Sequence, residues 1–521
     1  MSKEMQPHPR LRVFGPTAFS EAVALKKVRR IGTVSMRPVR FPADWIIAAL
    51  LDAALMLAIA LRCWRLFGDI CADEWLTLAT IAKPWSGLFA FAARDWVHPP
   101  GYYLLLKAWA LFAGVGGESI RLFSALCGVA SVWLTFHLGA ALGSSRAGAF
   151  GALLTALSSV HIFYSQLGRA YALEGVWALL LLWAAVRWAC APQSFRWRWI
   201  TGVAALGLVA THVLGWLMVA AASVWVWRHV PSGRRVWSFW LGACIAMTFA
   251  WLAFVRPPMR HYGADLYLHW IARPSLIAPL TTLKEFHGWI GLRAFSWAIA
   301  LVWWMPIAHA LAFCRYPQVR WLLFWSLAPI VALWLASRIA VPMYLTRYVL
   351  MAAPVYYLAV AFALERVPLA DERWTIRVVV LIWSVLGCIA LLTQPARLPL
   401  DALAQHVRAW PADAPVVAER TYLMNPLWHR LKDERDVRVL GANHLLVPPA
   451  NLEVSWDDIA GYDRFGIVYY NPETAERLNA LIASGYDVLD RGSLSGPGQQ
   501  RELQTIHWEL VRRKNVAQNP R

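Results

Sequence analysis

The chain has 521 residues, of which 59% are hydrophobic and only 16% are charged, and its mean hydropathy is +0.45. This composition excludes an ordinary soluble domain and is typical of a polytopic membrane protein. The formal net charge is +19. Because the basic residues cluster between apolar segments, we expect membrane lipids rather than nucleic acid as their partners. The seven cysteines show neither CxxC nor metal-ligand spacing, which argues against a zinc site or a disulfide framework.

The N-terminal arm, residues 1–42, carries nine Lys and Arg against two Glu, so its net charge is +7. The positive-inside rule therefore places it in the cytoplasm. Residues 44–64 are apolar and long enough to cross a membrane. Residues 65–117 then form a first outer loop, in which the amphipathic stretches Trp85–Arg94 and Tyr102–Phe112 predict juxtamembrane helices.

Further apolar runs follow at 119–142, 147–162, 172–190, 199–211, 213–228, 236–255, 294–314, 320–337, 348–364 and 376–393. With the first segment they predict an all-α transmembrane domain of about eleven crossings over residues 43–393. Most basic clusters fall in the turns that this parity places inside, as the positive-inside rule requires. The outer loop 256–293 is the exception, since it is also basic. An odd number of crossings places the residues after 394 outside.

After residue 394, helix-like and β-like stretches alternate and are separated by Gly, Asn, Asp and Pro. The helix-like stretches are Leu400–Trp410, Tyr422–Leu431 and Pro472–Ser484, and the β-like ones are Pro415–Ala418, Val437–Leu440, Gly466–Tyr470, Tyr486–Leu489 and His507–Arg512. This alternation predicts a soluble α/β domain over residues 394–521, built as a two- or three-layer sandwich. It contains no Gly-rich phosphate loop, so we assign it no catalytic role.

The predicted outer turns carry mixtures of acidic, basic, aromatic and amide side chains, whereas the inner turns carry simple Arg clusters. The outer set is Asp73, Glu74, His98, Tyr164, Gln166, Arg169, Tyr171, His212, Arg256, Arg347 and Tyr348. Ionisable residues at a bilayer edge are costly unless they are solvated, paired or used. The sequence therefore predicts one functional site on the outer side.

Several motifs in this order resemble a known family. They are Asp73-Glu74, His98-Pro99-Pro100-Gly101-Tyr102-Tyr103, Ile120–Leu126, Tyr164-Ser165-Gln166 with Arg169 and Tyr171-Ala172-Leu173, Thr211-His212 and Arg347-Tyr348. Over residues 44–365 the chain resembles the dolichyl-phosphate-mannose–protein mannosyltransferase-like group, to which the bacterial lipid A aminoarabinose transferases are related. The resemblance implies a GT-C fold and a glycosyltransferase that uses polyprenyl-phosphate sugars.

The resemblance further implies transfer of a sugar to an acceptor hydroxyl of a glycan, lipid or protein, with inversion. The predicted topology puts the site on the side opposite the basic arm, and the high Arg and Ala usage favours a bacterial source, so we expect the site at the periplasmic face of an inner membrane. A neutral hydroxyl is a poor nucleophile, so a carboxylate should take its proton, and Asp73 fits that role. The alternative is that Asp73 is only a solvated helix N-cap. Glu74 either orients Asp73 or the acceptor, or caps a helix.

The leaving polyprenyl phosphate needs fixed cations, and guanidinium groups match phosphate oxygens. Arg169 and Arg347 are the first choices and Arg256 the next, although basic residues near helix ends also snorkel to the interface. Arg121 is expected to anchor the second span at the membrane surface. Because Asp73 and Glu74 alone make a poor site for a divalent cation, we expect neither a metal nor another cofactor.

The remaining residues are expected to bind substrate. By the resemblance, His98 stands where relatives contact phosphate or sugar, although the aminoarabinose transferases have a lysine there; the alternative is that His98, beside two prolines, only ends a helix. His212 either bonds to the donor or packs against a helix end. A sugar pocket or, alternatively, an interfacial belt is expected from Tyr164, Gln166 and Tyr171. Tyr348 is also expected to bind substrate. Two other functions stay open: a transporter or flippase of lipid-linked sugars, and a scaffold whose C-terminal domain binds a cell-envelope partner.

Overall fold

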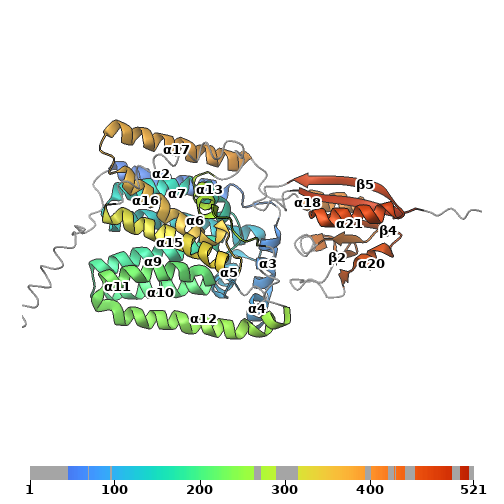
Figure 1. The fold of residues 1–521 in the computed structure, drawn as a ribbon, viewed down its shortest axis with the longest axis horizontal. Coiled ribbons are helices and arrows are strands. Elements are labelled where there is room, and N and C mark those ends of the chain that lie inside the picture. Colours follow the sequence, from blue (N-terminus) through green and yellow to red (C-terminus); the bar gives the residue numbers. More distant parts are fainter. Residues whose placement is uncertain are drawn as a thin grey trace, which may run out of the picture.

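The computed structural model describes residues 45–68, 70–93, 97–262, 271–288, 315–393, 400–419, 427–428, 430–440, 452–495 and 505–514. The predicted N-terminal arm and the predicted span 294–314 lie outside the described residues. Figure 1 shows two regions, a bundle of helices and, after Leu400, a β-sheet with helices packed on it.

The helices of the bundle follow the predicted apolar runs, except for α13, which lies in the predicted outer loop 256–293. They are α2 (Trp45–Cys63), α6 (Gly117–Ala141), α7 (Ser145–Ala156), α8 (Ser159–Ser165), α9 (Tyr171–Cys190), α10 (Phe195–Thr211), η1 (Val213–Gly215), α11 (Trp216–His229), η2 (Pro231–Gly233), α12 (Arg234–Tyr262), α13 (Ala278–His287), α15 (Pro317–Ile339), η4 (Thr346–Ala352), α16 (Ala353–Leu364) and α17 (Ala370–Thr393). Within the described residues, 7 helices are long and apolar enough to cross a membrane, or up to 8 with one bent pair. The predicted polytopic membrane fold is therefore confirmed.

The bent pair replaces the single span expected over residues 147–162. The helix axis turns by 64° between α7 and α8. Ser158 begins α8 as its N-cap, because its hydroxyl oxygen accepts a hydrogen bond from the His161 N–H at 3.3 Å. Because of this bend, α8 and the turn that follows it do not continue along the axis of α7.

Helix α16 forms the centre of the bundle. Every one of its residues is buried, and it packs against α7 and α15. A helix that is apolar on all sides can lie in a protein core or face lipid, and the burial of α16 on every side places it in the core. Because η4 continues directly into α16, Arg347 and Tyr348 at the start of η4 are carried by a rigid, fully packed element.

The first outer loop contains α3 (Ala72–Ala82), α4 (Trp85–Ala92) and α5 (Gly101–Ala113), the last two at the predicted juxtamembrane positions. Helix α3 lies at the end of the bundle nearest the sheet (Figure 1). The Lys107 ammonium donates to the Ile81 and Lys83 carbonyls, at 2.7 and 2.6 Å, and so caps the C-terminus of α3. Pro84 ends this helix, as expected for a residue before which helical backbone is disfavoured.

The C-terminal region is a three-layer α/β sandwich. Its strands are β1 (Val416–Ala418), β2 (Val437–Leu440), β3 (Glu453–Val454), β4 (Arg464–Tyr469), β5 (Tyr486–Ser495) and β6 (Thr505–Arg513). They form one six-stranded sheet in the order β3-β2-β1-β4-β6-β5, parallel from β3 to β4 and antiparallel beyond. Helix α18 (Leu400–Arg408) covers one face, while α20 (Trp456–Ala460) and α21 (Pro472–Ala483) cover the other. The predicted α/β domain is confirmed; the stretch 422–431 falls largely outside the described residues.

Candidate functional site

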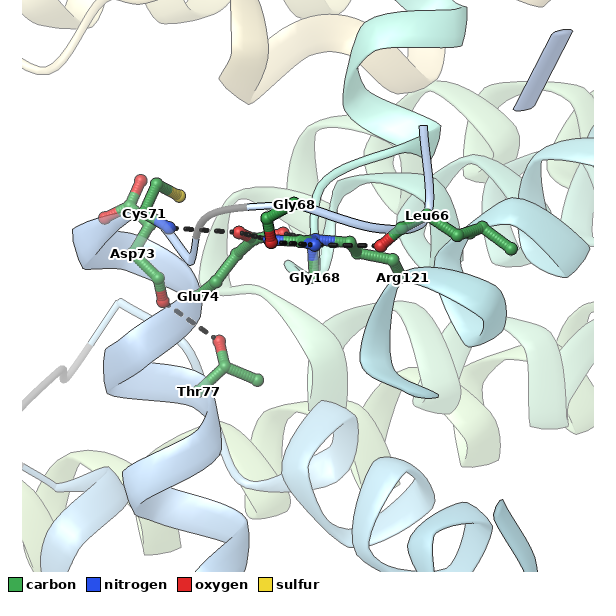
Figure 2. A network of polar contacts seen from close by, with 8 residues as sticks. All are labelled: Leu66, Gly68, Cys71, Asp73, Glu74, Thr77, Arg121 and Gly168. Carbon is green, nitrogen blue, oxygen red and sulfur yellow. Dashed lines mark hydrogen bonds and ion pairs between the residues drawn. The ribbon is translucent and has the colours of Figure 1, made fainter. Parts of the chain in front are cut away.

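The acidic pair lies in the first turn of α3, with Cys71 as the N-cap. Carboxylates are favoured there because they face the positive end of the helix dipole. Glu74 reaches back and accepts the Cys71 N–H at 3.2 Å, as in a capping box, and the Thr77 hydroxyl donates to the Asp73 carbonyl at 3.2 Å. Figure 2 shows the two carboxylates pointing to different sides, so they have different surroundings.

Glu74 forms a fully buried ion pair with Arg121. Its carboxylate accepts Arg121 Nε–H at 2.8 Å, Nη2–H at 2.7 Å and the Gly168 N–H at 3.1 Å. Arg121 Nη1 also donates to the carbonyls of Leu66 and Gly68, at 2.8 and 2.9 Å. This pair therefore joins α3, α6, the end of the first span and the turn after α8 at one point (Figure 2).

These contacts change two expectations from the sequence. Arg121 is not an anchor at the membrane surface, since its guanidinium is completely buried against Glu74. The Glu74 carboxylate is bonded to protein donors and inaccessible to solvent, and its contact with the Cys71 N–H matches the helix-capping alternative.

Asp73 faces a cation. Arg347 Nη1 lies 3.9 Å from Asp73 Oδ2, and the two side chains are 15% and 21% exposed. The electrostatic interactions of Arg347 also include the side chains of Tyr164, Tyr171 and Tyr348. The structure thus brings five of the predicted site residues together, although they come from four separate elements of the chain.

The two predicted histidines join this group through ring contacts. Ring centroids are 5.1 Å apart for Tyr164 and Tyr171, 6.4 Å for Tyr171 and His98, 4.7 Å for His98 and His212, and 5.4 Å for His212 and Tyr348. All five side chains are buried. We call these five rings, with Asp73 and Arg347, the acid–arginine–ring cluster.

The two histidine-bearing turns meet because of a close backbone approach. The Val213 N–H donates to the Val97 carbonyl at 3.1 Å. At Gly101, the first residue of α5, an added Cβ would lie 2.5 Å from the Ala210 carbonyl oxygen. Only glycine therefore allows α5 to pack this closely on α10, and a larger residue here would separate the two turns.

An apolar pocket of about 320 Å³ adjoins the cluster. Its lining includes Pro99, Pro100 and Gly101, which follow His98 in the chain, together with Val213, which follows His212, and Trp251 of α12. Because its walls are almost entirely hydrocarbon, the pocket suits an apolar chain rather than a sugar.

Arg169 is buried near Tyr171, one of the rings of the cluster. Its side chain is 5% exposed, and Nη1 donates to the Tyr103 hydroxyl at 3.5 Å. Its charge acts on Tyr171 and on Glu174, a fully buried acid of α9. Arg169 is therefore close to the cluster and also near Glu174, a buried acid that the sequence pattern does not single out.

Two other predicted residues lie elsewhere. Gln166 Nε2 donates to the Leu61 carbonyl of α2 at 2.6 Å, so its amide faces a helix end rather than the rings. Arg256 is exposed near the end of α12, and among the described residues no contact joins it to the cluster. Within the same described part of the chain, no three His, Cys, Asp or Glu side chains are grouped to hold a metal ion; the absence of a metal or cofactor stays a prediction.

No family model matches the chain, and no curated protein sequence matches it. The structure is similar to that of ArnT from Cupriavidus metallidurans in the apo state, with 14% identity and a TM-score of 0.56 over 90% of this chain and 98% of ArnT. For ArnT bound to undecaprenyl phosphate, the identity is 14% and the TM-score is 0.54, over 92% of this chain and 100% of ArnT.

A further similar structure is the archaeal oligosaccharyltransferase AglB from Archaeoglobus fulgidus, with 13% identity and a TM-score of 0.44 over 86% of this chain and 70% of AglB. At identities this low, similarity speaks for the fold. The likeness to ArnT extends over nearly the whole of both chains. The chain has the GT-C fold that its motifs predicted.

Proposed function

We propose that this protein is an integral membrane glycosyltransferase that moves a sugar from a polyprenyl-phosphate donor to an acceptor hydroxyl. The observation that carries the proposal is the pairing of Asp73 with Arg347, 3.9 Å apart and both partly accessible, at the edge of a group of buried rings. A displacement at a sugar carbon needs a base on one side and a cation for the leaving phosphate on the other.

Asp73 is the general base in this proposal. As the acceptor oxygen bonds to the anomeric carbon, the Asp73 carboxylate takes the hydroxyl proton. The bond from that carbon to the phosphate oxygen breaks, and the electron pair leaves with the lipid phosphate. Arg347 stabilises the negative charge on this phosphate, with Arg169 contributing from behind Tyr171. Attack opposite to the departing phosphate inverts the anomeric carbon.

The rings and the apolar pocket suit different parts of the donor, the sugar and the lipid. Tyrosine and histidine rings stack on sugar faces and supply hydrogen bonds, so the cluster suits the sugar. The pocket of about 320 Å³ beside His98 and His212 suits the first isoprene units of the lipid. That ArnT, which shares this fold, has been crystallised with undecaprenyl phosphate supports this class of donor.

Glu74 has a positioning role in this account. It holds Asp73 through α3 and holds the turn that precedes Arg169 through the Gly168 N–H. We place the cluster at the periplasmic face of a bacterial inner membrane, because the basic N-terminal arm favours the opposite side by the positive-inside rule.

The test is a transfer assay with purified protein and a panel of polyprenyl-phosphate sugars, with glycan, lipid and peptide acceptors. We expect one donor to be consumed with formation of an inverted product. Movement of an intact lipid-linked sugar across vesicles, without cleavage of its phosphate bond, would instead support the flippase alternative and contradict the enzyme proposal.

A further inference from the structure

A second arginine, outside the acid–arginine–ring cluster, is completely buried at the end of α2. Arg62 Nη1 donates to the Ala156 carbonyl at 3.1 Å, and Nη2 donates to the Thr155 carbonyl at 3.0 Å. Nη2 also lies 2.9 Å from His161 Nδ1. One guanidinium therefore contacts both α7 and α8, the two halves of the broken helix.

The break between α7 and α8 leaves backbone carbonyls at the end of α7 that need hydrogen-bond donors. The last carbonyls of a helix have no intrahelical partner, and α7 ends at Ala156. In a membrane, where water is scarce, an unbonded carbonyl is strongly unfavourable, so another donor has to be found. Arg62 supplies that donor to the Ala156 carbonyl and adds a donor to the Thr155 carbonyl, which also accepts the Ser158 N–H at 3.4 Å, so the chain can turn by 64° with both carbonyls bonded.

The contact with His161 joins Arg62 directly to α8. Because the guanidinium can only donate, His161 Nδ1 must accept, and the ring is held as the tautomer with its proton on Nε2. At the other end of α8, Gln166 donates to the Leu61 carbonyl, which belongs to the same turn of α2 as Arg62. The last turn of α2 thus holds α8 at both ends.

The packing around this guanidinium leaves no spare room. At Gly128 of α6, an added Cβ would lie 2.7 Å from Arg62 Nε and 2.3 Å from Ser165 Oγ. A glycine at this position therefore lets Arg62 and α8 approach α6. Tyr164, the residue before Ser165, contacts the Tyr171 ring of the cluster.

We propose that Arg62 is a positioning residue, which fixes the angle of α8 and thereby places the Tyr164 ring against Tyr171, where its hydroxyl interacts electrostatically with Arg347. Arg62 touches no reacting atom and acts only through α8. The consequence for sugar transfer rests on the proposed function, whereas the consequence for α8 does not. The two are therefore measured separately.

The first measurement is amide hydrogen exchange of residues 159–166 in Arg62→Met, with Arg65→Met as the matched control. Arg65 is three residues further on and donates to the carbonyls of Leu391 and Leu392, at 3.1 and 2.6 Å, near the end of α17. Both changes remove a guanidinium from helix-end carbonyls. We expect exchange in α8 to become at least about tenfold faster only in Arg62→Met.

The second measurement is transfer kinetics. A reacting group displaced by about 1 Å can cost about 100-fold in rate. We expect Arg62→Met to lower kcat by about 10- to 100-fold, to change the donor KM by less than about threefold, and Arg65→Met to change neither by more than about twofold. If Arg62→Met does not fold, His161→Leu removes only the contact with α8 and should show the same pattern more weakly.

Unchanged exchange in α8 of the folded variant would overturn the proposal, as would faster exchange with an unchanged kcat. If the wild-type protein transfers no sugar from any donor, the proposed function fails. The exchange measurement alone then decides whether Arg62 fixes α8.

Discussion

The buried Glu74–Arg121 pair gives the most quantitative prediction. Glu74→Leu leaves Arg121 as an uncompensated buried cation, and Arg121→Leu leaves the Glu74 carboxylate without its two guanidinium bonds of 2.8 and 2.7 Å. Removing one partner of a buried ion pair typically costs about 3–5 kcal/mol. Each single change should therefore lower the free energy of unfolding by about that amount.

The double change should cost much less than the sum of the single ones, because no buried charge then stays unpaired. Residues in one hydrogen-bond network show coupling of about 0.5–3 kcal/mol, and a fully buried pair belongs at the upper end. The double variant does lose the bonds to the Leu66 and Gly68 carbonyls. At about 1–3 kcal/mol for each unsatisfied group, it should still be less stable than the wild type.

The assay is reversible unfolding in detergent micelles, followed by circular dichroism for the wild type, both single variants and the double variant. Arg477→Met is the control, since Arg477 pairs with Glu473 at 3.2 Å with both side chains exposed, at 59% and 68%, and this pair should contribute no more than about 1 kcal/mol. Additive effects of the two single changes, within about 0.5 kcal/mol, would refute the view that Glu74 and Arg121 act as a unit.

Three further predictions concern the cluster and its surroundings. Arg347→Met should weaken donor binding by about 10- to 100-fold, measured by calorimetry, because it removes a charge-assisted contact worth about 1.5–3 kcal/mol; unchanged affinity would exclude Arg347 as the phosphate ligand. Gly128→Ala should lower the free energy of unfolding by about 1–3 kcal/mol through overpacking, whereas Gly242→Ala, where an added Cβ meets nothing within 4 Å, should not. Transfer should persist in EDTA, since Glu74 is engaged by protein donors and Asp73 is left as a single carboxylate ligand; loss of activity that Mg²⁺ or Mn²⁺ restores would contradict this.

The boundaries of many elements could be predicted because they depend on local patterns. The sequence predicts a juxtamembrane helix over Tyr102–Phe112, and α5 spans Gly101–Ala113. Strand β2 coincides with the predicted stretch Val437–Leu440. In both cases apolar periodicity and flanking turn residues give the limits without reference to the rest of the chain.

The break between α7 and α8 could not be predicted in this way. Residues 147–162 contain no proline and no Asp, Glu, Lys or Arg. The Ser158-Ser159 pair is the one local feature that favours a new helix start, and it does not by itself give a bend. The bend depends on donors from Arg62, which is 94 residues from Ala156 in the chain. Tertiary contacts of this kind decide the backbone direction after local propensity has been satisfied.

The residues that form the site could be predicted only in part, because residue type is local information whereas contacts between distant residues are not. Asp73, Arg347 and the rings were selected by residue type and by their places in outer turns, and the structure brings them together. Residue type alone could not show that Glu74 is bonded to Arg121, 47 residues away. Nor could it show that the Gln166 amide binds a backbone carbonyl.

The central claim is that Asp73 is the base, and one substitution tests it most directly. Asp457 is an exposed residue in the first turn of α20, as Asp73 is in the first turn of α3, so Asp457→Asn matches the loss of a helix-terminal charge. We expect Asp73→Asn to lower kcat by about 100-fold or more, with donor affinity within about threefold of the wild type, and Asp457→Asn to leave both unchanged. Transfer by Asp73→Asn at the wild-type rate would contradict the account.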